Sequence, residues 1–145
     1  MMKVYLDNCC FNRPFDDQSS LIVHLETEAK LYVQELIKQG RLMLLWSFML
    51  DYENKANPFV EIRSWIARWK KLAMEDCEIS DEIQVKSKEF MLLGIKKKDA
   101  IHLAYAVQLG AEFFITTDKR ILNKTINEVM CLNPIDFVRR YCNAT

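Results

Sequence analysis

Residues 96–122 read KKKDAIHLAYAVQLGAEFFITTDKRIL, and this stretch contains the clearest helical pattern of the chain. The apolar spacing predicts a helix over 96–110 and, after Gly110, a buried strand over 113–117. Asp99 lies in the first turn of that helix, and Asp118 follows the strand directly. The stretch therefore predicts a helix and a strand that each carry a carboxylate at one end.

The same alternation extends over the rest of the chain. Further strands are predicted at 3–6, 41–46, 75–80 and 129–132. Helices are predicted at 18–39, from Ser47 onward, and at 59–73, 81–94 and 134–142. Apolar strands that alternate with helices are typical of a parallel sheet covered on both faces. We therefore expect a single domain over residues 1–145, with a three-layer α/β/α fold and a mainly parallel sheet of four to five strands.

The predicted helix at 18–39 has a signal at each end. Asp17 is a residue type that commonly caps the start of a helix. Gly40 is a residue type that commonly follows the last turn. We therefore expect Asp17 to begin this helix and Gly40 to end it.

Composition excludes several classes of protein. Half of the 145 residues are hydrophobic, and 20 basic residues balance 20 acidic ones, which disfavours disorder and any global attraction to nucleic acid. With three glycines, the chain has neither a GxGxxG nor a GxxxxGK[ST] phosphate-binding loop. Its five irregularly spaced cysteines favour reduced thiols. No signal peptide or membrane span is predicted, so we expect a cytoplasmic protein.

Four acids are predicted to meet at one edge of the sheet. Asp7 ends the first strand before a polar loop, and Asp118 ends another strand. Glu53 lies about two turns into the helix that follows the strand 41–46, and Asp99 opens the helix 96–110. Sites in open parallel sheets form beyond the carboxyl ends of the strands. The four carboxylates are therefore expected to be neighbours.

Clustered carboxylates repel one another unless cations neutralise them. A site made of carboxylate oxygens suits Mg²⁺ or Mn²⁺. Such ions activate water and stabilise the attacking and leaving oxygens of a phosphodiester. The four acids therefore predict metal-dependent phosphodiester hydrolysis.

Each acid also has a structural interpretation that the spacing leaves open. Asp7 can cap a turn, and Glu53 can be a solvated helix residue. Asp99 can stabilise its helix through the dipole, and Asp118 can cap a following short helix.

These segments together resemble the PIN domain, a small α/β fold of metal-dependent ribonucleases, over nearly the whole chain. The matching segments are YLD at 5–7, SFMLDYE at 47–53, residues 96–122, and the final strand and helix. Residues 96–122 are the most specific, because they combine an acid that opens a helix, the small helix residues Ala100, Ala104 and Ala106, a glycine, an apolar strand and the sequence TTD.

The resemblance implies that Asp7, Glu53, Asp99 and Asp118 hold Mg²⁺ or Mn²⁺ and activate water to cut RNA. It also implies that Thr117 shapes the site beside the last acid. Many bacterial members of the family are toxins of toxin–antitoxin pairs, so an antitoxin protein and a homodimer are the implied partners.

Two features depart from the family pattern. Asn8 stands where the family usually has Thr or Ser, and the segment NRPFDDQ at 12–18 is not general to the family. Two other functions remain as alternatives: a non-catalytic module of the same fold that binds nucleic acid or regulates, and a structure-selective DNA nuclease. The intact set of four acids disfavours the first, and the absence of long clamp insertions disfavours the second.

Basic residues near the acids predict contacts to RNA phosphates. Arg13 is predicted either to bind a phosphate or to form an ion pair with Asp16 or Asp17. Lys98 and Lys119 belong to two short basic runs that flank the acids, and these runs predict either an RNA-binding rim or a solvated face.

Three aromatic or histidine side chains leave two interpretations open. Trp65 and Trp69 are four residues apart and share a helix face, so packing in the core or at a dimer interface is expected, with base stacking as the alternative. His102 lies one turn after Asp99 and is expected to be a packed core histidine, with a position facing the site as the alternative.

Overall fold

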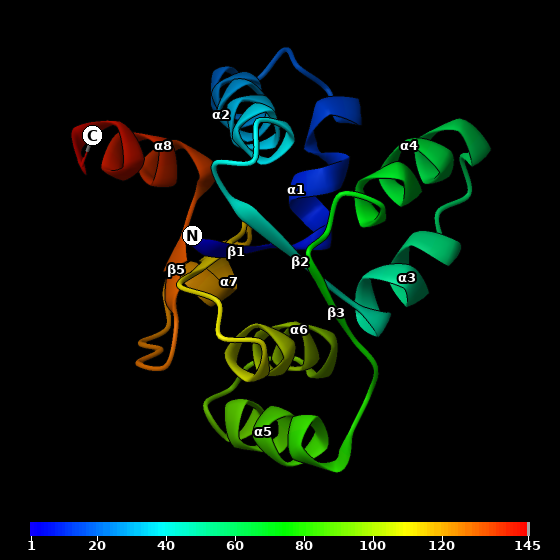
Figure 1. Ribbon diagram of the computed structural model, residues 1–145, viewed down its shortest axis with the longest axis vertical. Coiled ribbons are helices and arrows are strands. Elements are labelled where there is room, and N and C mark those ends of the chain that lie inside the picture. The colour runs from blue at the N-terminus through cyan, green and yellow to red at the C-terminus, as the bar shows by residue number, and fades with distance from the viewer. Residues whose placement is uncertain (145) are drawn as a thin grey trace.

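The computed structural model describes residues 1–144 and contains a sheet of five parallel strands (Figure 1). The strands lie side by side in the order β3-β2-β1-β4-β5. Their bounds are β1 Lys3–Leu6, β2 Met43–Ser47, β3 Glu75–Cys77, β4 Phe113–Ile115 and β5 Met130–Leu132. The predicted α/β class and the predicted parallel sheet are therefore confirmed.

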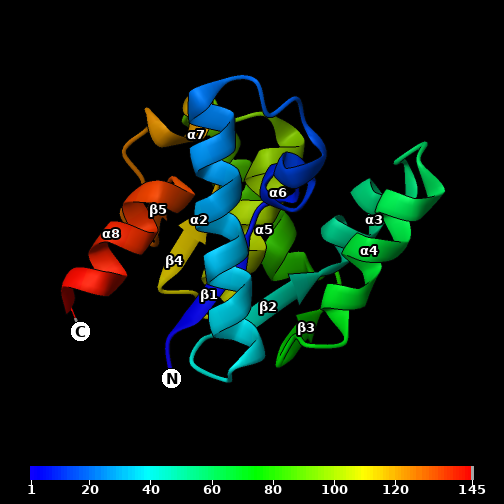
Figure 2. The same cartoon turned by 90° about the horizontal axis from the view of Figure 1, so that it is seen from above.

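Helices cover both faces of this sheet, as predicted. Helices α2 and α8 pack together on one face, and α5 and α6 pack together on the other (Figures 1 and 2). Helices α3 and α4 are neighbours beside β2 and β3. The helices are α1 Asn8–Asn12, α2 Leu21–Lys38, α3 Phe48–Lys55, α4 Val60–Lys70, α5 Asp81–Leu92, α6 Lys97–Gln108, α7 Lys119–Leu122 and α8 Pro134–Ala144, with a 3₁₀ turn η1 at Arg13–Phe15. Within residues 1–144, none of the helices combines the length and apolar composition needed to cross a bilayer.

The central strand β1 is buried on both faces, which explains its unbroken apolar sequence. Val4, Tyr5 and Leu6 have no exposed surface. Full burial of a side chain such as Leu6 contributes about 1.5–3 kcal/mol to stability. A strand with helices on both faces has no solvent side, so apolar residues do not need to alternate with polar ones.

The order of the strands reverses between β1 and β4. From β1 the chain runs outward to β2 and β3, and it then returns to form β4 on the other side of β1. Leu6 at the end of β1 pairs with Ile115 at the end of β4. The carboxyl ends of these two neighbouring strands therefore open at the switch point where ligands bind in folds of this kind.

The polar segment after Asp7, expected as a loop, forms α1 and η1. The Asp7 carboxylate accepts a hydrogen bond from the Asn8 backbone N–H at 2.8 Å and so caps α1. Cys10 and Phe11 of α1 are buried, and the Phe11 ring packs against Trp46 with centroids 5.4 Å apart. The cap and this apolar contact explain why a polar sequence becomes helical here.

The prediction that Asp17 caps α2 is wrong. Ser20 is the cap, and its Oγ accepts the Val23 backbone N–H at 3.5 Å. The Asp17 carboxylate is engaged locally instead, because it accepts the Ser19 N–H at 3.0 Å. The predicted end of the helix is confirmed, since Gly40 follows α2 with a φ of +74°, a conformation that favours glycine.

Candidate functional site

The register of β1 and β4 brings Asp7 beside the residues that follow β4. The Asp7 N–H donates to the Ile115 carbonyl at 2.9 Å and continues the ladder between the two strands. The Thr116 hydroxyl donates to Asp7 Oδ2 at 2.8 Å and accepts the Asp118 N–H at 3.1 Å. Thr116 is fully buried and therefore joins the first acid to the segment that carries the last one.

Thr116 is a site residue that the sequence prediction missed. Thr117 was expected to shape the site, but it is only half-buried and its backbone N–H donates to Cys9 Sγ at 3.4 Å. The two threonines are adjacent and identical, so only the strand register decides which hydroxyl reaches Asp7. Alternation of side chains in β4 gave no signal, because Phe114 and Ile115, which lie on its two faces, are both fully buried.

Asp7 is both a helix cap and a member of the site. Its side chain is buried and accepts hydrogen bonds from Asn8 N–H, Thr116 Oγ1 and, at 3.5 Å, the Cys9 thiol. The capping interpretation and the site interpretation of this residue are therefore compatible. Three donors hold the carboxylate in one orientation.

Glu53 reaches the site from the opposite side of β1, through His102. Ser47 caps α3 at the predicted start of this helix, and its Oγ accepts the Leu50 N–H at 3.2 Å. Glu53 projects from the last turn of α3, and its Oε1 lies 2.6 Å from His102 Nε2 in α6. The same nitrogen is 3.8 Å from Asp7 Oδ1, so one imidazole lies between two of the predicted ligands.

His102 is fully buried, as expected, and it also faces the site. Its Nδ1 is hydrogen-bonded to the Tyr5 hydroxyl at 2.6 Å, which in turn is 2.6 Å from Ser47 Oγ. A chain of hydrogen bonds therefore runs from Ser47 through Tyr5 and His102 to Glu53. His102 comes three residues after Asp99 on α6, and this spacing was the signal for a position facing the acids.

The pKa values of this pair shift in opposite directions. Burial raises the pKa of Glu53, but the hydrogen bond from His102 and the His102 charge outweigh it, so the net shift is downward. Burial lowers the pKa of His102, but Glu53 and Asp7 outweigh it, so the net shift is upward. Both shifts favour an ionised pair.

Asp99 shows most clearly that the acids form one electrostatic unit. Burial, followed by the charges of Asp7 and Asp118, raises the pKa of Asp99 to about 6. The helix dipole at the start of α6 favours the charged form of an acid in the first turn. The dipole interpretation alone therefore fails to account for the upward shift, which comes first from burial and then from the neighbouring carboxylates.

Asp118 caps α7, as its structural interpretation predicted. Its Oδ1 accepts the Arg120 N–H at 2.9 Å, and the Arg120 guanidinium contacts both carboxylate oxygens at 3.2 and 3.0 Å. The bond from Arg120 lowers the pKa of Asp118 and outweighs the effect of burial. The Arg120 side chain is largely exposed, so this ion pair contributes little to stability and opens easily.

The donor chemistry of the four acids fits a hard divalent cation. Within residues 1–144, no three His, Cys, Asp or Glu side chains are already grouped to hold a metal ion. Glu53 is engaged by His102, and Asp118 by Arg120. A cation would relieve the repulsion that helps to raise the pKa of Asp99 and would draw the partly buried Asp118 away from the exposed Arg120 side chain. The residues therefore fit Mg²⁺ or Mn²⁺ after a side-chain movement.

Two hollows flank the acids. One has a volume of about 350 Å³ and is lined by Asp99 together with Lys96, Arg120 and Lys124. The other has a volume of about 330 Å³ and is lined by Glu53 together with polar residues that include Asn8 and Asn12. Basic side chains therefore surround Asp99, and Lys96 and Arg120 among them belong to the two basic runs that flank the acids in the sequence.

The three basic residues predicted to bind phosphate lie in different surroundings: one is near Glu53, one is exposed, and one forms ion pairs. Lys98 lies 5.9 Å from the Tyr52 ring centroid and is close enough to lower the pKa of Glu53. Lys119 is exposed on α7. Arg13 pairs with Asp16 at 3.0 Å, as one interpretation predicted, and also with the buried Glu26 at 3.3 Å.

The sequence matches no protein-family model and no curated protein sequence. The fold is similar to solved structures over nearly the whole chain. VapBC2 from Rickettsia felis, solved with a DNA fragment from its promoter, matches with a TM-score of 0.61 and 12% identity, covering 91% of this chain and 98% of that one. FitAcB from Neisseria gonorrhoeae matches with a TM-score of 0.60 and 12% identity, covering 90% of this chain and 97% of that one. VapBC-1 from nontypeable Haemophilus influenzae matches with a TM-score of 0.59 and 16% identity, covering 92% of this chain and 98% of that one. These similarities confirm the predicted PIN-like fold.

Proposed function

We propose that the protein is a metal-dependent endoribonuclease that hydrolyses RNA phosphodiester bonds, and that it is the toxin of a toxin–antitoxin pair. The observation that carries this proposal is the position of the acids at the switch point of the sheet, where Thr116 joins the Asp7 carboxylate to the backbone N–H of Asp118. Burial and the charges of Asp7 and Asp118 raise the pKa of Asp99, an effect that a bound cation would offset.

Mg²⁺ or Mn²⁺ would be held by Asp7, Glu53, Asp99 and Asp118. When bound, the ion would supply Lewis-acid stabilisation of the phosphoryl charge and make water a stronger nucleophile. The donors around Asp7 fix its carboxylate before any ion arrives, so less ordering is needed on binding. His102 does the same for Glu53 through the 2.6 Å hydrogen bond.

The basic residues on the Asp99 side would bind the RNA backbone. Lys96, Lys124 and Arg120 line the hollow beside Asp99, and Arg120 also pairs with Asp118. Arg120 would exchange its carboxylate partner for a phosphate when Asp118 turns to the metal ion. Sequence specificity is not part of the proposal, because phosphate contacts position RNA and do not read its bases.

The structural neighbours support the biological part of the proposal, since they belong to toxin–antitoxin systems. We infer an antitoxin protein and a second copy of the chain as partners. Helix α2 offers a surface for a partner, because Leu21, Ile22 and Leu25 are exposed next to one another. Sedimentation of the purified chain, compared with a Leu21→Glu variant, tests the dimer: the wild type should sediment as a dimer and the variant as a monomer.

The test of activity is cleavage of labelled RNAs, both single-stranded and structured, in Mn²⁺, in Mg²⁺ and in a chelator. DNA strands of the same sequences are run in parallel. Wild type is compared with Asp118→Asn and Asp7→Asn. Glu112→Gln serves as a matched control, because Glu112 is exposed and lines neither of the two hollows. We expect cleavage of RNA that needs metal, falls by about 100-fold or more in the two site variants, and is unchanged in the control.

Other outcomes identify the alternatives. Cleavage confined to DNA would assign a DNA nuclease. Absence of cleavage, together with no rise of the melting temperature in millimolar Mn²⁺, would assign a non-catalytic module of this fold, because an ion that binds the native state must stabilise it.

A further inference from the structure

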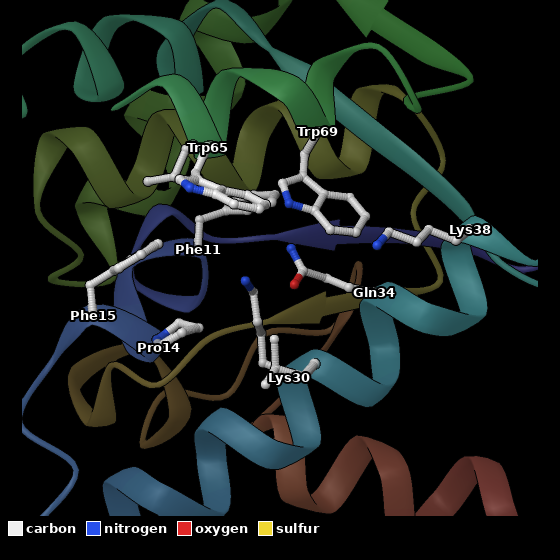
Figure 3. Close-up of a pocket in the computed structure, with 10 residues that line it drawn as sticks. Phe11, Pro14, Phe15, Lys30, Gln34, Lys38, Trp65 and Trp69 are labelled. Atoms are coloured by element: carbon white, nitrogen blue, oxygen red, sulfur yellow. The ribbon is translucent and has the colours of Figure 1, made fainter. Parts of the chain in front are cut away.

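A cavity of about 290 Å³ lies between α2, α4 and the segment formed by α1 and η1 (Figure 3). None of the four acids lines it. Its volume is at the small end of the range of roughly 300–1,000 Å³ that is typical of pockets for small molecules. The cavity is therefore a second candidate site, separate from the nuclease centre.

Aromatic side chains form the walls of this cavity. Trp65 and Trp69 line it from α4, Phe11 lines it from α1, and Phe15 lines it from η1 (Figure 3). Trp65 is 55% exposed and is therefore not a core residue, so packing at a dimer interface stays a prediction for it, whereas Trp69 is partly buried against the core. Indole and phenyl groups that line one hollow are suited to a flat aromatic ligand.

Two hydrogen-bond donors from α2 complete the cavity. Lys30 and Gln34 are one helical turn apart, and their exposed fractions are 3% and 4%. Figure 3 shows that the nitrogen atoms of both side chains point into the cavity. Gln34 Nε2 is buried without a hydrogen-bond partner. In the described part of the chain Lys30 has no carboxylate partner, and its ammonium lies 5.5 Å from the centroid of the Phe11 ring.

The charged side chains that line the cavity are all basic. Lys30 and Lys38 are both present, Lys38 lies 5.3 Å from the centroid of the Trp69 ring, and no acidic residue lines the cavity. Burial lowers the pKa of Lys30 to about 7, which shows how poorly its charge is compensated. Buried polar groups without partners cost free energy, and an anionic acceptor placed between them would remove that cost.

We propose that this cavity binds a small aromatic carboxylate. Its ring lies against Trp65 and Trp69, and its carboxylate accepts hydrogen bonds from Lys30 Nζ and Gln34 Nε2. The apolar walls account for the ring, and the two unpartnered donors account for the acid. The proposal does not depend on nuclease activity.

The probe is 2-naphthoate, compared with the neutral 2-naphthamide, which has nearly the same shape. Binding to the full chain is followed by tryptophan fluorescence and by the melting temperature. We expect saturable quenching and a raised melting temperature with 2-naphthoate, with an affinity at least about tenfold higher than that of the amide, because a charge-assisted hydrogen bond is stronger than a neutral one. Equal binding of the two compounds would assign the cavity to an apolar partner surface and overturn the proposal, as would no binding of 2-naphthoate at millimolar concentration.

Variants then test the two donors. Lys30→Met should weaken 2-naphthoate by about tenfold or more and leave 2-naphthamide unchanged, and Gln34→Leu should weaken 2-naphthoate severalfold. Lys55→Met is the matched control, because Lys55 is exposed on α3 and does not line the cavity. Circular dichroism checks the fold of each variant. Unchanged 2-naphthoate affinity in folded Lys30→Met or in folded Gln34→Leu would refute the assignment of these donors.

Discussion

Replacement of Thr116 by valine removes one hydroxyl from the centre of the candidate site. Thr116 Oγ1 donates to Asp7 Oδ2 at 2.8 Å and accepts the Asp118 N–H at 3.1 Å. Valine has nearly the same shape, so the variant leaves a buried carboxylate oxygen and a partly buried N–H without these partners. A hydrogen bond to a charged group contributes about 1.5–3 kcal/mol, and an unpaired buried donor costs about 1–3 kcal/mol. Because the Cys9 thiol still contacts Asp7 and the Asp118 segment is partly exposed, we expect a total loss of about 2–4 kcal/mol.

The assay is urea unfolding at pH 7 without metal, with the melting temperature as a second measurement. The expected loss corresponds to a decrease of roughly 6–12 °C for a chain of this size. Thr117→Val is the matched control, because the hydroxyl of Thr117 has no hydrogen-bond partner in the described part of the chain. We expect the control to change stability by less than about 0.5 kcal/mol. A loss below about 1 kcal/mol in Thr116→Val, or an equal loss in both variants, would refute the argument that Thr116 holds the site together.

Three further predictions concern the charges, the buried network and the backbone. The pKa of Asp99 is about 6 in the folded chain against an ordinary value of 3.8, so the folded state binds more protons between these values and stability falls as the pH rises through this window. Asp99→Asn should therefore raise the metal-free melting temperature by a few degrees at pH 7 and change it little near pH 3.5. An unchanged or lower melting temperature at pH 7 would contradict the raised pKa. Tyr5→Phe removes the hydroxyl between His102 and Ser47 and should cost about 1–3 kcal/mol in urea unfolding, so a cost near zero would mean that the chain of hydrogen bonds does not stabilise the fold. Gly40→Ala should cost about 1–2 kcal/mol, since Gly40 has a φ of +74° but no atom within 4 Å of an added Cβ, and a smaller loss of melting temperature than in Thr116→Val is the expected result.

The site was predictable where a single residue follows a strand or opens a helix. Asp7, Asp99 and Asp118 could be placed in this way, because their positions depend on local patterns and on the general geometry of parallel sheets. Thr116 and His102 could not be assigned in the same way. Thr116 is separated from its partner Asp7 by 109 positions, and His102 from its partner Glu53 by 49, so their contacts exist only once strands and helices are assembled.

The buried face of α2 shows why the surroundings of individual side chains could not be predicted from the sequence. Glu26, Lys30 and Gln34 are buried on this helix, whereas Leu21 and Ile22 are exposed. Hydrophobic periodicity predicts the helix itself, but it assigns the apolar side chains to the buried face. The observed orientation depends on partners from elsewhere in the chain, such as Arg13, which pairs with Glu26 at 3.3 Å.

The amino-acid sequence by itself determined the alternation of helices and strands, the parallel sheet, and the acids at the ends of its elements. These features follow from periodicity, turn residues and helix signals that act within a few residues. The tertiary structure alone decided which hydroxyl holds Asp7, that His102 joins Glu53 to the core, that Arg120 engages Asp118, and that two donors face an aromatic cavity. Such contacts join segments distant in the sequence, and their geometry depends on register and packing, which no local pattern encodes.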